Sequence, residues 1–180
     1  MLEQKQTGLI DTYKRHINYL RISITDRCNL RCLYCAPARP AKISHESILR
    51  YEEILRLTRI AADLGITKVR VTGGEPFVRN GCCDFLEKLT CMEELSDISI
   101  TTNGVLLSRH LPRLYRMGIR RLNISLDTLD PEKYRKITGF SAFRRVWDAI
   151  HSALDTGFSP VKINVVALKG INDDELTDLA

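Results

Sequence analysis

Short apolar stretches alternate with helix-like segments along most of the chain after residue 18. The short stretches are predicted as strands, and the segments between them as helices, because apolar residues recur there every three or four positions. This order is typical of βαβ units, which build a parallel sheet. The predicted strands are 19–25, 68–72, 97–101, 121–125 and 161–168, and the predicted helices are 51–64, 82–89, a segment containing Leu107, Leu111 and Leu114, and 143–154.

Apolar and polar residues also alternate within the predicted strands. Leu20 and Ile22 flank Arg21, for example, and Val69 and Val71 flank Arg70. Parallel strands that are buried on both faces should instead be continuously apolar. We therefore expect helices on the apolar face only, with the polar face forming the interior of a partial barrel; an open sheet with a solvated face is the alternative. The residues predicted to line the interior are Arg21, Arg70, Thr101, Ser125, Lys162 and Asn164.

Five strands do not close a (β/α) barrel, which needs eight. The expected fold class is therefore α/β, a partial (β/α) barrel truncated after about five βα units, with residues 1–180 forming one incomplete domain. Barrels of this kind place their active sites in the loops that follow the strands. The loops with the most distinctive residues, such as Gly73-Gly74-Glu75-Pro76 and Thr102-Asn103-Gly104, all fall there.

The charges are spread along the chain, with 27 Lys and Arg against 22 Asp and Glu, a net +5. This balance permits an anionic ligand but gives no support for nucleic acid or a membrane surface as a partner. The first residues lack the apolar core of a signal peptide, and no segment is apolar for long enough to span a membrane. We therefore expect a cytoplasmic protein, whose six cysteines are more suited to metal chemistry than to disulfides.

Three of the cysteines, Cys28, Cys32 and Cys35, form a CxxxCxxC motif directly after the first predicted strand. Three thiolates can hold a cubane iron–sulfur cluster and leave its fourth iron open. A zinc site with His45 as the fourth ligand is one alternative. Three buried cysteines on one helical face are another, but polar residues between them disfavour it. The residues alone favour the cluster modestly over zinc.

The motif and the Gly-Gly-Glu-Pro turn together resemble the radical S-adenosylmethionine (SAM) enzymes, in which the cysteines bind a [4Fe-4S] cluster and the turn binds the methionine end of SAM. The resemblance extends to the GTP 3′,8-cyclase (MoaA) family of molybdenum cofactor biosynthesis. It rests on the segments YLRISITDRCNLRC (19–32), RVTGGEP (70–76), TTNG (101–104), NISLD (123–127), KINVV (162–166) and GINDDE (170–175).

The family resemblance implies a role for individual residues. Cys28, Cys32 and Cys35 would ligate the cluster. The residues implied to contact SAM are Tyr34, Gly74 and Ser125, with Glu75 close to its amino group. The residues implied to contact GTP are Arg21, Arg70, Thr101 and Lys162. No catalytic side chain is implied beyond the cluster and the cosubstrate.

The resemblance also implies a reaction, in which reduced cluster and SAM generate a 5′-deoxyadenosyl radical that takes hydrogen from the GTP ribose and starts cyclisation. The implied partners are GTP, an electron donor protein, a downstream enzyme that forms cyclic pyranopterin, and a second copy in a full-length homodimer. The family carries a second cluster whose cysteines are missing here. A different radical SAM enzyme, such as a peptide maturase, and a non-catalytic Cys3His zinc module are the alternatives.

Overall fold

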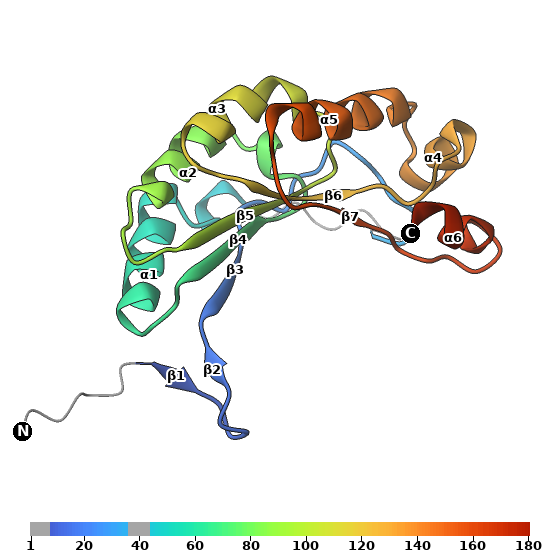
Figure 1. Ribbon diagram of the computed structural model, residues 1–180. Helices are drawn as coiled ribbons and strands as arrows, with labels where there is room; N and C mark the ends of the chain where they lie inside the picture. The colour runs from blue at the N-terminus through green and yellow to red at the C-terminus, as the bar shows by residue number, and fades with distance from the viewer. Residues whose placement is uncertain (1–7, 36–43) are drawn as a thin grey trace, which may run out of the picture.

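Five parallel strands form the centre of the molecule in a computed structural model that describes residues 8–35 and 44–180 (Figure 1). They lie in the sheet in the same order as in the sequence, each hydrogen-bonded to the next. The strands are β3 (Tyr19–Ser23), β4 (Lys68–Thr72), β5 (Asp97–Thr102), β6 (Arg121–Ser125) and β7 (Val161–Asn164). The predicted α/β class and the partial barrel are thereby confirmed, and the sheet is open at both edges.

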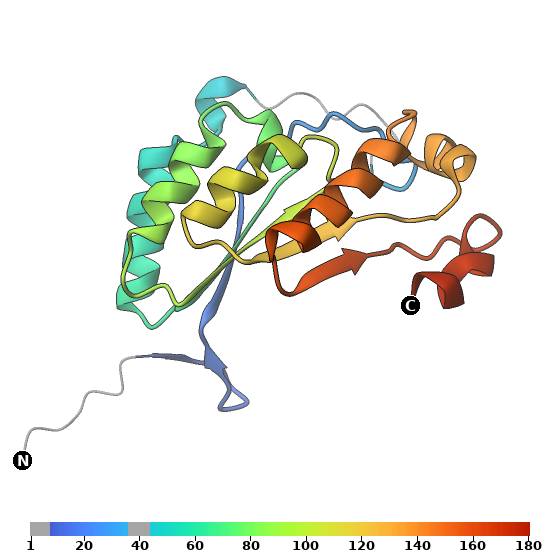
Figure 2. The same ribbon diagram turned by 45° about the horizontal axis from the view of Figure 1, so that its top comes forward.

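Helices from each of the four connections between the strands cover one face of the sheet (Figures 1 and 2). They are α1 (Tyr51–Asp63), α2 (Cys82–Thr90), α3 (Leu111–Arg116) and α5 (Phe143–Thr156). Strand residues that point towards them, such as Val71, Ile100 and Leu122, are fully buried. This is the arrangement that right-handed crossover connections produce.

The other face of the sheet is polar, as the alternation predicts. Neighbouring strands place Arg21 beside Arg70, and Arg70 beside Ser99. Nearer the carboxyl ends, Asn123 lies between Thr101 and Lys162. The face therefore carries rows of polar side chains that run across the strands.

Several elements differ from the prediction. The strand predicted at 161–168 ends at Asn164, because the next loop bonds to side chains instead of the sheet; the Val166 amide donates to Asp127 Oδ1 at 2.9 Å. The helix α4 (Pro131–Thr138) was not predicted, although Asp130 caps it and Gly139 ends it. The remaining elements are the β1 (Leu9–Ile10) and β2 (His16–Ile17) hairpin, the short helix α6 (Leu176–Leu179), and the 3₁₀ turns η1 (His45–Ser47), η2 (Pro76–Val78), η3 (Ser108–His110) and η4 (Asp173–Glu175).

Within residues 8–35 and 44–180, every helix is too short or too polar to be a candidate membrane span.

Candidate active site

A pocket of about 340 Å³ lies at the carboxyl ends of the strands. It receives residues from the loops after all five strands and from α4. Seven of the predicted site residues line it, namely Cys28, Cys32, Cys35, Tyr34, Gly74, Thr101 and Ser125. Asn164, predicted to line the barrel interior, does so as well. The strand order thus brings together loops that are far apart in the sequence.

The three motif cysteines are free thiols that share this pocket. The sulfur of Cys28 accepts hydrogen bonds from the Leu30 amide at 3.4 Å and from Asn103 Nδ2 at 3.6 Å. Burial raises the pKa of Cys28, and it raises the pKa of Cys32 to about 11. Burial therefore favours the neutral thiols, and a bound metal centre would favour the thiolates.

The donor set suits an iron–sulfur cluster. Among the described residues, no group of three His, Cys, Asp or Glu side chains converges on a single ion. A cubane cluster requires less convergence, because each thiolate binds a different iron, and N–H donors to sulfur are typical of such sites. The side chain of His45, the fourth ligand of the zinc alternative, lies outside what the structure describes.

The glycine turn after β4 packs against the start of the cysteine loop. The Gly74 amide donates to the Thr25 carbonyl at 2.7 Å, and the Glu75 amide donates to the Arg27 carbonyl at 2.8 Å. These two amides are therefore already used within the protein. What the turn can offer a ligand is its carbonyl oxygens, which accept hydrogen bonds from an ammonium group.

The Glu75 side chain does not line the pocket, although the resemblance implied a place beside the SAM amino group. It is fully buried, and its carboxylate accepts hydrogen bonds from the Thr102 hydroxyl at 2.8 Å, the Asn103 amide at 2.7 Å and the Phe77 amide at 3.2 Å. Burial raises the pKa of Glu75, and these hydrogen bonds oppose the rise. In this position Glu75 joins the loops after β4 and β5.

Asp127 connects the cysteine loop to the loop after β7. Its Oδ2 accepts a hydrogen bond from the Tyr34 hydroxyl at 2.7 Å, and its Oδ1 accepts one from the Val166 amide. Burial, followed by this bond to Asp127, raises the pKa of Tyr34 well above its ordinary value. The Tyr34 hydroxyl is thus already engaged, and it is the rest of Tyr34 that a ligand can contact.

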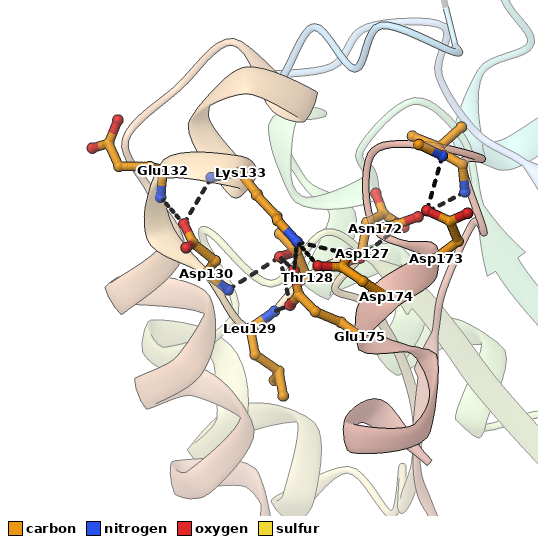
Figure 3. A network of polar contacts seen from close by, with 12 residues as sticks. Asp127, Thr128, Leu129, Asp130, Glu132, Lys133, Asn172, Asp173, Asp174 and Glu175 are labelled. Atoms are coloured by element: carbon orange, nitrogen blue, oxygen red, sulfur yellow. Dashed lines mark hydrogen bonds and ion pairs between the residues drawn. The ribbon is translucent and has the colours of Figure 1, made fainter.

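The GINDDE segment holds the loops after β6 and β7 together (Figure 3). Asn172 is fully buried and donates to the carbonyls of Asp127 at 2.6 Å and Val166 at 2.9 Å. The Glu175 carboxylate accepts the Thr128 hydroxyl, the Leu129 amide and Lys133 Nζ, all within 2.9 Å. We call this set of contacts the GINDDE brace.

The cationic side chains predicted to bind GTP lie outside the pocket, on the same polar face of the sheet. Arg21, Arg70 and Lys162 do not line the pocket. Arg70 lies over the Tyr19 ring at 5.5 Å and donates to the Ser99 hydroxyl at 3.5 Å. No ion pair is found for Arg21, Arg70 or Lys162 among the described residues. Their charges are available to an anion.

Sequence reasoning missed several residues that line the pocket. Asn103 directly follows β5 and Asp127 lies two residues after β6; the sequence singled out both segments, but neither residue was assigned a role. Tyr134 and Thr138 also line the pocket, and they come from α4, which was not predicted. No local pattern indicates that this helix turns towards the cysteines.

Residues 22–180 match the model of the radical SAM superfamily, so the chain belongs to this superfamily. Solved structures agree in fold. SuiB from Streptococcus suis bound to S-adenosylmethionine has a TM-score of 0.72 at 24% identity, over 90% of this chain and 37% of that protein. The protein anSMEcpe with bound AdoMet has a TM-score of 0.62 at 23% identity, over 82% of this chain and 42% of that one. The superfamily implies SAM and a [4Fe-4S] cluster as cofactors.

The more particular resemblance is to GTP 3′,8-cyclases, and it is confirmed. The chain is 52% identical to the GTP 3′,8-cyclase of Petrotoga mobilis over 169 residues, which are 93% of this chain and 52% of that protein. It is 51% identical to that of Thermodesulfovibrio yellowstonii over 172 residues, 94% of this chain and 53% of that protein. The chain thus spans about half the length of the curated relatives it matches.

Proposed function

We propose that this chain provides the cluster- and SAM-binding part of a GTP 3′,8-cyclase in the first step of molybdenum cofactor biosynthesis. The observation that carries the proposal is the pocket in which three free thiols face a glycine turn at the carboxyl edge of the sheet. Sequence identity of about half to proteins named for this activity supports the choice of substrate. We also propose the partners that the resemblance implied, an electron donor protein, a downstream enzyme and a homodimer, and the cytoplasmic location expected from the sequence.

Cys28, Cys32 and Cys35 would hold the cluster in this pocket. When bound, cluster and SAM supply radical chemistry that the side chains cannot perform. Gly74, Ser125 and Tyr34 would contact SAM, the last through its ring or backbone. Glu75 would act by holding the glycine turn, since its carboxylate is buried and fully engaged.

GTP would bind along the polar face beneath SAM. Thr101 lines the pocket, and it lies in the same row of the sheet as Lys162. Arg21 and Arg70 lie one row further from the carboxyl ends, about 7 Å away at roughly 3.3 Å per residue. That spacing is within the length of one nucleotide. Guanidinium and ammonium groups bind phosphate through charge-assisted hydrogen bonds, so the row can hold and orient a triphosphate.

The first test is loading with iron and sulfide under anaerobic conditions. We expect the unsubstituted chain and Cys91→Ala to take up iron and acid-labile sulfide, and Cys32→Ala to lose most of both, because Cys91 is exposed and does not line the pocket. Stoichiometric zinc without sulfide, or equal iron in both variants, would contradict the proposal.

The second test concerns the substrate. With SAM and a reductant, we expect a full-length protein that contains this chain to form 5′-deoxyadenosine faster with GTP than with CTP. Formation that is indifferent to the nucleotide would rule out a GTP cyclase and leave another radical SAM activity.

A further inference from the structure

The hydroxyl of Tyr134 is a buried polar group without a hydrogen-bond partner among the described residues. The residue is only 2% exposed. A buried donor that is left unpaired is costly, so native proteins seldom keep one without a reason, and an absent ligand is one such reason. Tyr134 also lines the pocket of the three cysteines. The unpaired hydroxyl therefore belongs to a residue of the candidate active site.

Backbone contacts hold α4 against the cysteine loop. The Thr138 carbonyl accepts a hydrogen bond from the Arg31 amide, and the Ile137 carbonyl accepts one from the Leu33 amide, both at 2.9 Å. These two amides flank Cys32. In Figure 2 the segment after β3 runs alongside α4. Cys32 is thus held next to the carboxyl end of this helix.

Tyr134 lies one helical turn before Thr138, on the same face of α4. The Thr138 hydroxyl donates to the Tyr134 carbonyl at 2.8 Å, and the Tyr134 ring packs edge-on against Phe143 with centroids 6.0 Å apart. The contact with Phe143 restricts the ring, and the Thr138 bond is made to the backbone of Tyr134. Burial, followed by the neighbouring Cys32, raises the pKa of Tyr134, so the hydroxyl keeps its proton and remains a donor.

We infer that the Tyr134 hydroxyl donates a hydrogen bond to a sulfur atom of the bound iron–sulfur cluster, either a sulfide or a cysteine thiolate. The inference rests on the proposed function and adds to it a residue that sequence reasoning did not find. Once the cysteines ligate iron, the pocket offers sulfur atoms that carry negative charge as acceptors, whereas the Asp127 carboxylate already accepts from Tyr34 and Val166. Tyr134 is then a positioning and tuning residue, because donors to sulfur stabilise the more negative, reduced cluster.

The chain offers a matched control in Tyr51. Its hydroxyl is the other buried side-chain polar atom found without a partner in the described part of the chain. Its ring stacks on Phe85 in the helical layer, with centroids 4.7 Å apart, and it does not line the cysteine pocket. A Tyr→Phe substitution therefore removes the same kind of group at both positions, but only one of them is placed near the cluster.

The experiment compares Tyr134→Phe and Tyr51→Phe in the apo and loaded chain. In the apo chain we expect neither variant to melt below the unsubstituted protein, since each loses only an unpaired hydroxyl. After loading, we expect equal iron content in all three. The equilibrium constant for cluster reduction should fall about tenfold in Tyr134→Phe, a shift of 59 mV to more negative potential for one electron. Tyr51→Phe should keep the original potential.

The outcomes are distinct. An unsubstituted chain that takes up no iron would overturn the proposed function, and this inference with it. A chain that loads normally but has the same potential in Tyr134→Phe would overturn the inference alone. A changed affinity for SAM with an unchanged potential would assign the hydroxyl to the cosubstrate instead of to sulfur. Changed iron–sulfur stretching bands in the resonance Raman spectrum of Tyr134→Phe alone would support the bond to sulfur directly.

Discussion

The close approach of the glycine turn to the cysteine loop makes Gly74→Ala a sharp test of the site. A Cβ at residue 74 would lie 2.7 Å from the carbonyl carbon of Arg27 and 2.9 Å from the carbonyl oxygen of Asp26, and closer still to the Arg27 oxygen. Ordinary contacts begin near 3.4 Å, so the Arg27 carbonyl carbon alone requires a separation of about 0.7 Å, and the closer Arg27 oxygen requires more. All three atoms belong to the backbone, so no side chain can simply rotate away.

The cost follows from what holds the two loops together. Overpacking of this kind costs about 1 to 3 kcal/mol. The separation also strains the hydrogen bonds from the Gly74 and Glu75 amides, each with a net value of about 1 kcal/mol. We expect the free energy of unfolding to fall by about 2 to 4 kcal/mol. In a protein of this size that lowers Tm by about 5 to 15 °C.

The assay is thermal unfolding followed by circular dichroism, together with iron content after loading. Gly8→Ala is the matched control, because a Cβ there would meet only His16 Nδ1 at 3.7 Å. We expect Gly8→Ala to melt like the unsubstituted chain, and Gly74→Ala to melt lower and to load less iron. Equal melting of the two variants, within about 2 °C, would refute the close packing of turn and loop.

Three further predictions concern other parts of the site. Tyr34→Phe removes the donor to the buried Asp127 carboxylate and should lower the free energy of unfolding in urea by about 1.5 to 3 kcal/mol; an unchanged midpoint would contradict the bond. Burial raises the pKa of Glu175, but the hydrogen bonds of the GINDDE brace outweigh burial and hold this pKa below its ordinary value. The stability that the ionised carboxylate contributes is therefore complete above about pH 4.5 and is lost as the pH falls through the lowered pKa. Glu175→Gln should abolish this acid dependence of Tm, and identical acid profiles of the variant and the unsubstituted chain would be evidence against the brace. Lys162→Ala should weaken GTP binding about tenfold in calorimetric titrations, while Lys88→Ala on α2 should not, and equal affinities would remove Lys162 from the GTP site.

Much of the fold could be predicted because its signals are local. Alternation with a period of two predicted the strands and their polar face, and the order of elements predicted a parallel sheet. The boundaries were less accurate where tertiary contacts compete with the sheet, as at Asn164, where the chain leaves β7 to bond with Asp127. The helix α4 carries a capping residue and a terminal glycine, Asp130 and Gly139, but it is only eight residues long.

In the candidate site, too, local features could be predicted from the sequence and tertiary contacts could not. Cys28, Cys32 and Cys35 are close in the sequence, so the motif favoured a shared cluster, with a zinc site and three buried core cysteines as the alternatives. The direction of the Glu75 carboxylate could not be predicted, because its donors Thr102 and Asn103 come from a different strand and loop. A motif specifies which residue types are present, whereas the neighbouring strands decide which way they point.

The sequence by itself determined the class of fold, the polar face of the sheet and the cluster of three cysteines, since each depends on residues within a few positions of one another. Only the tertiary structure decided that Tyr34 bonds to a residue 93 positions away, and that Tyr134, whose buried hydroxyl has no hydrogen-bond partner among the described residues, lines the cysteine pocket. The physical reason is that such contacts arise from the order of strands in the sheet and from the packing of helices on it. Neither the strand order nor the helix packing produces a local pattern of residues in the sequence.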